Sequence, residues 1–462
     1  GHHLIFDGID RREVEPANPD QKEKPYYVPE FEIAAEDPTA TVIPALKRFA
    51  SAAFRRDADD ETIAPYLILF QGELTKGFSF EEAYRTALAA MLCSPDFLYF
   101  KEPNGRLDDD ALANRLSYFL TRTAPDTTLR AMAHSGRLTS EPGALRAEAD
   151  RLIASKHFER FIRDFLDGWL DLRDIEFTTP DERLFPEFDP YLQDSMVEET
   201  RAFFRELIDS NLPVTHLVKS DFSMLNWRLA EHYEIEGVTS PTVEKVSIPA
   251  GVPRGGILSQ ASILKVSANG TNTSPVLRGV WINERLLGKH PASPPPGIPG
   301  VEPDIRGAET IRELLAKHRD SESCQACHEM IDPPGFALES FNPVGGWRDT
   351  FRSLGEGEKP EQTVVGSKRI RYKHGPPVDA SGTLEDGRRF AGFLEFRDVI
   401  SEEEDQLARA LLTHLLTFST GRKMGFSDLA EIESLVEASA RQGHGVRNLF
   451  YLVLESDIFR TK

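Results

Sequence analysis

Hydrophobic residues recur every three or four positions over much of this chain, which is the spacing of one face of an α-helix. The pattern becomes regular after residue 40, in three successive segments. Ser79, three residues before Glu82, predicts a capping box at the start of the third segment. We expect a small helical domain over residues 41–105. Before it, residues 1–40 are charged and proline-rich and predict an extended arm or the remnant of a preceding domain.

The helical spacing continues over residues 106–237. Its strongest apolar face carries Phe158, Phe161, Phe165 and Trp169, an arrangement typical of core packing. The segment has no Glu-x-x-His pair, so we expect its histidines to be surface or satisfied core residues rather than ligands of a metal pair. The segment therefore predicts a helical bundle domain.

Small, turn-forming residues replace this pattern at about residue 238. They are concentrated in residues 251–258 and 267–275, and a proline-rich connection follows at 291–303. Such segments indicate loops around a site, so we predict an irregular, loop-rich domain over residues 238–350.

Two further regions complete the predicted fold. Residues 351–390 are charged and irregular and predict a connector with short strands. Residues 391–462 predict a C-terminal helical domain, with helices at 405–420 and 428–440. The whole chain is thus expected to be a mainly α, multi-domain protein.

The charge and hydropathy of the chain exclude some function classes. Its 75 acidic and 54 basic residues give a formal net charge of -21, which argues against binding to nucleic acid and favours basic partners. No apolar run approaches the roughly 20 residues needed to cross a bilayer, so we expect no membrane span.

The strongest chemical signal is the motif Cys324-Gln325-Ala326-Cys327-His328. Two thiols three positions apart, with a histidine directly after the second, form the spacing that attaches a haem covalently through two thioethers. The adjacent imidazole then takes one axial position on the iron. We therefore predict Cys324 and Cys327 as attachment residues for haem c and His328 as the iron ligand.

Other uses of the two thiols remain open at this stage. A structural zinc site needs four Cys or His ligands, and the third and last cysteine, Cys93, stands alone and far away. A thioredoxin-like redox pair would sit where a strand enters a helix, whereas the flanks here are helical before the motif and rich in proline and glycine after it. A disulfide is a further alternative. Cys93 itself is expected to be a small buried hydrophobic residue.

The residues around the motif predict the surroundings of the group. Residues 332–335, Asp-Pro-Pro-Gly, predict a turn, and Phe336, Leu338 and Phe341 predict an apolar wall that excludes water from the iron. Arg278 is expected to pair with a haem propionate or to form an ordinary surface salt bridge.

The sixth iron position decides between kinds of function. Met424 and His374 are the candidate ligands, and either would give a six-coordinate electron carrier. An open position would instead permit peroxide or oxygen chemistry.

With these residues described, the chain resembles the C-terminal part of the planctomycete-type multi-domain cytochrome c proteins, which are assembled from domains of unknown function. The resemblance covers about residues 42–460. It implies an exported, haem-bearing redox protein that uses Cys324, Cys327 and His328 as stated, and it implies no particular reaction. The stretches that carry it are 49–56 with 90–100, 114–120 with 221–226 and 232–233, 273–279 with 324–348, and 379–382 with 415–428.

We therefore expect an exported c-type monohaem redox protein that transfers electrons in a periplasmic system. The alternatives are a haem enzyme, oxidase or peroxidase-like, acting on an extracytoplasmic substrate, and a binding scaffold with a structural haem. Because a c-type haem is assembled outside the cytoplasm, an export signal is expected upstream of residue 1. The expected partner is a redox protein, either an upstream cytochrome domain or a basic protein.

Overall fold

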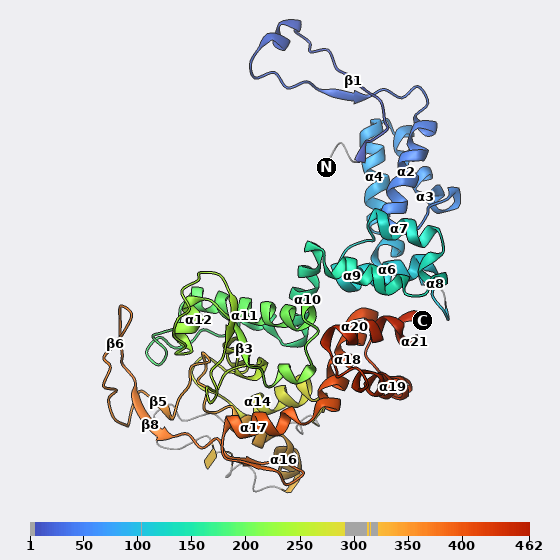
Figure 1. Cartoon of the computed structure of the whole chain (residues 1–462). Helices are drawn as coiled ribbons and strands as arrows, with labels where there is room; N and C mark the ends of the chain where they lie inside the picture. The colour runs from blue at the N-terminus through green and yellow to red at the C-terminus, as the bar shows by residue number, and fades with distance from the viewer. Residues whose placement is uncertain (1–4, 103, 292–311, 314, 316–321) are drawn as a thin grey trace. The chain divides into compact units, whose positions relative to one another are not determined.

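The computed structural model describes residues 5–102, 104–291, 312–313, 315 and 322–462, with side chains in the last range from residue 328 onward. Helices dominate it, and its strands are short (Figure 1), as the sequence predicted. The described chain forms two compact units. The first comprises Gly1–Tyr118, Arg122–Leu152 and Arg460–Lys462, and the second Phe119–Thr121 and Ile153–Phe459.

The first unit begins with an antiparallel pair of strands, β1 (Arg11–Glu13) and β2 (Phe31–Ile33), within the predicted arm. Three helices then pack around a common apolar core, as their spacing predicted. The capping box between Ser79 and Glu82 is present at the start of the third. The helices of this part of the chain are α2 (Pro38–Phe54), α3 (Asp60–Thr75), α4 (Phe80–Leu92), α5 (Pro95–Leu98), α6 (Asp109–Thr121), α7 (Thr127–His134), α8 (Arg137–Ser140) and α9 (Ala144–Ile153).

The prediction that Cys93 is buried is wrong, since its side chain is exposed. Helix α4 buries a stripe at four-residue spacing that includes Ala83, Ala87 and Met91. Cys93 is the residue that ends this helix, two positions after Met91, and it therefore falls off the buried stripe.

The second unit is also mainly helical. The predicted aromatic face of α10 is buried, and the rings of Phe158, Phe161 and Phe165 stack with centroids 5.1 Å apart along the series. This confirms packing as the role of that face. The longer helices of the unit are α10 (Glu159–Trp169), α11 (Pro190–Asp209), α16 (Glu322–Ala337), α17 (Phe393–Ser401), α18 (Glu404–Thr420), α19 (Leu429–Ala440) and α20 (Val446–Glu455).

Short helices and paired strands occupy the segments that were predicted to be irregular, and a strand and a short helix also lie at residues 222–232, within the segment predicted to be a helical bundle. Strand β3 (Phe222–Leu225) pairs with β4 (Glu244–Ser247), β5 (Thr350–Ser353) with β8 (Lys373–Pro377), and β6 (Val364–Val365) with β7 (Lys368–Arg369), each antiparallel. The short helices are α12 (Trp227–His232), α13 (Ala261–Val266), α14 (Pro275–Trp281) and the π-helical turn η6 (Ile282–Leu286). None of the helices in the described ranges is both long and apolar enough to span a bilayer.

The predicted turn at residues 332–335 is wrong, because α16 continues through Pro333 and Pro334 to Ala337. A proline in a helix interior removes one backbone hydrogen bond and leaves a carbonyl without its donor. For Pro334 that carbonyl belongs to Met330, and Asn283 on η6 donates its side-chain amide to it at 3.3 Å. A tertiary contact therefore replaces the missing bond and lets the helix continue.

Candidate functional site

Helix α16 carries the whole Cys-x-x-Cys-His motif. The side chains of Cys324 and Cys327 lie outside the described residues, so their predicted role stays a prediction. The side chain of His328 is described and lies nearly two turns into the helix, which packs on α14, η6 and α17.

A buried carboxylate orients His328. The imidazole Nδ1 lies 2.9 Å from Oδ1 of Asp332, one helical turn further on, and the two side chains are 14% and 0% exposed. Because a carboxylate accepts, Nδ1 carries the proton of this hydrogen bond. Histidines that bind metals in proteins commonly donate their other ring N–H to a carboxylate in this way.

Sequence reasoning missed Asp332, which was assigned only to a turn. The signal was present, since His328 and Asp332 are four positions apart and therefore share a helix face. It was not used because the two prolines after Asp332 indicated that the helix had already ended.

Glycines allow α14 and α16 to approach closely (Figure 1). A Cβ atom on Gly279 of α14 would lie 1.8 Å from the carbonyl oxygen of Ile331, and one on Gly335 of α16 would lie 1.8 Å from that of Pro275. Real carbon atoms do not approach an oxygen so closely, so both positions require glycine. The crossing of the two helices fixes the part of α16 that carries Asp332.

Arg278 on α14 secures the chain just after α16. Its side chain is fully buried, and Nη1 donates to the carbonyl oxygens of Leu338 at 2.6 Å and Phe341 at 2.8 Å. The predicted surface salt bridge is therefore wrong. A propionate contact stays untested, but the terminal nitrogens of Arg278 already have protein acceptors, and its ion pair is with the buried Glu339 at 3.4 Å.

A second arginine shares that carboxylate. Arg348 donates from Nη2 to Glu339 at 3.1 Å and to the hydroxyl of Thr273 at 2.7 Å. Burial lowers the pKa of Arg278 to about 10 and that of Arg348 to about 9, so both stay positively charged at neutral pH. The carboxylate of Glu339, shared by Arg278 and Arg348, therefore links the segment after α16 to α14. Thr273 extends this link to the loop before α14.

The predicted apolar wall is buried as expected. Phe336, Leu338 and Phe341 are each exposed by 2% or less. Phe341 packs edge-on against Trp347 and Phe393, with ring centroids 5.2 and 4.8 Å away. These residues form part of the unit's core directly after the helix that carries His328.

The two candidate sixth ligands lie in different parts of the unit. Met424 is half-buried in the loop between α18 and the short turn η7 (Phe426–Asp428). His374 is exposed on β8, where its Nδ1 lies 3.0 Å from the hydroxyl of Thr350. Their role as ligands stays a prediction.

The described residues fit a haem held through His328 in two respects. His328 has the carboxylate partner that a metal-binding imidazole commonly has, and Asp332 is fully buried, which holds that partner in place. The buried apolar side chains at the end of α16 and just after it are of the kind that excludes water from an iron site. In the described ranges, no group of three or more His, Cys, Asp or Glu side chains is arranged to hold a metal ion by itself.

A buried carboxylate also occurs on α11, away from α16. Glu199 is 1% exposed and accepts hydrogen bonds of 2.6 Å from the hydroxyls of Ser223 and Tyr233. Burial raises the pKa of Glu199 to about 7. Arg254 covers the ring of Tyr233, with its guanidinium carbon 3.7 Å from the ring centroid, and donates to the carbonyl of Gly345 at 2.8 Å.

Four family models match successive parts of the chain, and each describes a protein of unknown function. They are DUF1595 over residues 44–102, DUF1592 over 107–235, DUF1588 over 254–351 and DUF1585 over 386–459. No curated protein and no solved structure matches the chain. The chain is therefore built from four domains of unknown function, which together are the domain set of the planctomycete-type multi-domain cytochrome c proteins.

Proposed function

We propose that the chain is an exported c-type monohaem protein that passes electrons to a redox partner in a periplasmic system. The haem would be attached through Cys324 and Cys327, with His328 as axial ligand. The single observation that carries the proposal is the hydrogen bond from Nδ1 of His328 to the buried Asp332, because metal-binding histidines commonly donate this ring N–H to a carboxylate.

The helical backbone around the motif supports the same assignment. Residues three and four positions apart share a helix face, and positions 324, 327 and 328 have this spacing on α16. A single group beside this face could therefore bond to all three. When bound, the haem would supply a one-electron couple at its iron, and the protein sets its potential.

In this proposal Asp332 tunes that potential. A carboxylate that accepts the Nδ1 proton makes the imidazole more electron-rich, which favours the higher charge on a bound metal. The buried position of Asp332 strengthens this effect, since little solvent screens its charge. The net charge of -21 further suits a basic redox partner, whose approach it would accelerate at low ionic strength.

The test is the absorption spectrum of the protein produced with an export signal and a c-type maturation system. We expect a haem spectrum that remains with the chain after denaturation. Cys324→Ser with Cys327→Ser should abolish this covalent retention. If the exported protein carries no haem, the proposal is wrong.

The role of Asp332 has a separate readout. Asp332→Asn should raise the midpoint potential, whereas Glu329→Gln, which changes an exposed carboxylate on the same helix, should change it much less.

Addition of carbon monoxide to the reduced protein distinguishes the two kinds of haem protein. A spectrum that does not respond supports electron transfer, and a ligand-accessible iron supports a haem enzyme instead.

A further inference from the structure

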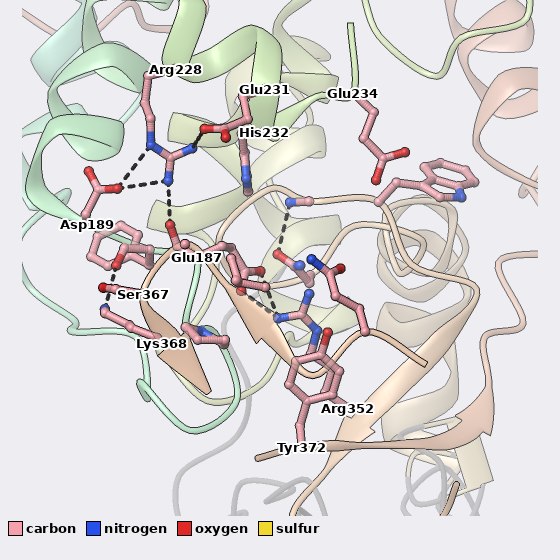
Figure 2. Close-up of a pocket in the computed structure, with 18 residues that line it drawn as sticks. Glu187, Asp189, Arg228, Glu231, His232, Glu234, Arg352, Ser367, Lys368 and Tyr372 are labelled. Carbon is pink, nitrogen blue, oxygen red and sulfur yellow. Dashed lines mark hydrogen bonds and ion pairs between the residues drawn. The ribbon is translucent and has the colours of Figure 1, made fainter. Parts of the chain in front are cut away.

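A polar pocket of about 660 Å³ opens in the second unit, and none of its lining residues belongs to the Cys-x-x-Cys-His motif. Figure 2 shows side chains from several elements converging on it, with His232 of α12 directed toward its centre. Arg228 comes from the same helix, Arg352 from β5 and Lys368 from β7. Another part of the wall is the loop 342–347, which follows α16 in the chain.

Asn342 in this wall has an unused polar group. Its side chain is 1% exposed, and its Oδ1 accepts from the backbone amides of Val344 at 2.9 Å and Gly346 at 3.0 Å. These two donors fix the amide orientation, because an exchanged oxygen and nitrogen would put donors against donors. Nδ2 is then buried without a hydrogen-bond partner among the described residues. A buried donor in that state is costly unless something else accepts from it.

Gly346 keeps the space beside this donor open. A Cβ atom there would lie 2.7 Å from Nδ2 of Asn342 and 3.5 Å from Cε1 of His232. Any larger residue would therefore fill the gap between the amide and the imidazole. Both Asn342 and Gly346 line the pocket, so the unused donor borders its cavity.

His232 supplies an acceptor beside that donor. Its Nε2 lies 2.7 Å from the carbonyl oxygen of Val344 and must carry the hydrogen, since a carbonyl only accepts. Burial, together with the positive charge of Arg254, lowers the pKa of His232 to about 3. The imidazole is therefore neutral, and its Nδ1 presents a lone pair.

The charges in the pocket already compensate one another. Arg228 donates to Asp189 at 2.9 Å and to Glu231 at 3.2 Å. Arg352 donates through Nη1 to both carboxylate oxygens of Glu187, at 2.8 and 2.9 Å. Lys368 is less closely paired, since its Nζ lies 3.8 Å from a carboxylate oxygen of Glu182 and 3.4 Å from the carbonyl oxygen of Phe188. The lining nevertheless has no excess of positive charge for a phosphate or carboxylate ligand. Its four carboxylates exceed its three cations, and these groups are Glu187, Asp189, Glu231 and Glu234 against Arg228, Arg352 and Lys368. The lining therefore favours a ligand without charge.

Aromatic surface lies next to these polar groups. Trp347 is 40% exposed at the pocket, and Tyr372 and Phe188 also line it. Amphipathic rings of this kind offer a flat apolar face beside a hydrogen-bonding edge. A ligand that suits the pocket has many hydroxyl groups, each able to donate and accept, and an apolar face.

We infer that this pocket binds a neutral polyhydroxylated ligand, namely a short oligosaccharide. Its hydroxyls would accept from Nδ2 of Asn342 and donate to Nδ1 of His232, while one sugar face packs on Trp347. This function goes beyond electron transfer and does not depend on it, since no residue of the pocket belongs to the haem motif.

The test is isothermal titration calorimetry of the full-length protein as isolated from the exported form. The neutral probes are maltotriose, cellotriose and xylotriose, and the charged probes are inorganic phosphate and trigalacturonate. We expect at least one neutral trisaccharide to bind and neither charged probe to compete with it. Binding of charged probes alone, or of no probe, would overturn the inference.

Single substitutions, compared with a control outside the pocket, test whether the oligosaccharide binds in this pocket. Asn342→Asp keeps the acceptor oxygen but removes the donor, and should weaken binding about tenfold or more. Trp347→Ala should weaken it as well, whereas Trp227→Ala, at a tryptophan that is also 40% exposed but does not line the pocket, should leave it unchanged. Circular dichroism verifies that each variant is folded. Equal effects at the two tryptophans would place the binding elsewhere and refute the inference, whatever the haem content of the protein.

Discussion

Two clusters of arginine and carboxylate side chains draw members from the segment after α16, and they differ in what their polar groups contact. In the first, Arg278, Glu339 and Arg348 are buried, and the terminal guanidinium nitrogens of Arg278 contact backbone carbonyls and Glu339. In the second, Arg352 and its partner Glu187 border a cavity.

The difference separates charged side chains that hold the core together from charged side chains that border the cavity. The terminal nitrogens of Arg278 donate to backbone carbonyls and to Glu339, so this side chain contributes to holding the fold. Its Nε, like Nδ2 of Asn342, is buried without a partner among the described residues, but Asn342 lines the pocket and Arg278 does not. A place beside the cavity, rather than the state of one donor, therefore distinguishes the two clusters.

The largest expected effect is the loss of a buried guanidinium. Arg278→Met should lower the free energy of unfolding by about 3–5 kcal/mol, because it leaves several carbonyls without donors and changes the charge balance around Glu339. Arg352→Met should cost only about 1–3 kcal/mol, since solvent reaches the pocket and can replace the lost bonds. Urea unfolding followed by circular dichroism measures both. Equal losses would remove the proposed distinction between the clusters.

The next effect concerns Glu199, which supports the pocket wall through Tyr233 and Arg254. Its folded pKa of about 7 lies above the ordinary value of 4.5, so the folded state retains a proton that the unfolded state releases. Stability from this group is therefore present below pH 4.5 and is lost as the pH rises toward 7, by roughly 3 kcal/mol in total. Glu199→Gln should flatten the decline in unfolding free energy between pH 5 and pH 7.5. A variant with the same slope as the parent protein would contradict the raised pKa.

The smallest expected effect tests the helix crossing that lies between the haem motif and the first cluster. Gly335→Ala should destabilise the protein by about 1–3 kcal/mol, because its Cβ would overlap the carbonyl of Pro275. Gly72→Ala in α3 is the control, since a Cβ there meets no atom within 4 Å. In the helix interior this change should stabilise by about 0.5–1 kcal/mol. Thermal unfolding of the two variants should therefore shift in opposite directions.

Sequence patterns predicted the elements that depend on local order. The mainly α fold, the C-terminal helices and the short strands of the connector follow from spacing and turn residues, and the Ser79–Glu82 capping box was found from two positions alone. The strand β3, within the predicted helical bundle, was not predicted. The burial of Phe336, Leu338 and Phe341 followed from their apolar character. These features need no knowledge of distant residues.

Features that depend on distant contacts were not predicted. The continuation of α16 through two prolines requires the amide of Asn283, which lies far back in the sequence. The pocket draws its lining from before α11, from α12, from the loop after α16 and from β5, and these are close only in the folded chain. No local pattern identifies Asn342 as different from any other asparagine in a turn.

The prolines of α16 also have a consequence for the order of folding. Because Pro333 and Pro334 supply no backbone N–H, the second half of this helix lacks two of the bonds that would stabilise it in isolation. The amide of Asn283 completes it only after α14 and η6 have docked. The segment between His328 and Ala337 therefore becomes helical together with its tertiary contacts rather than before them.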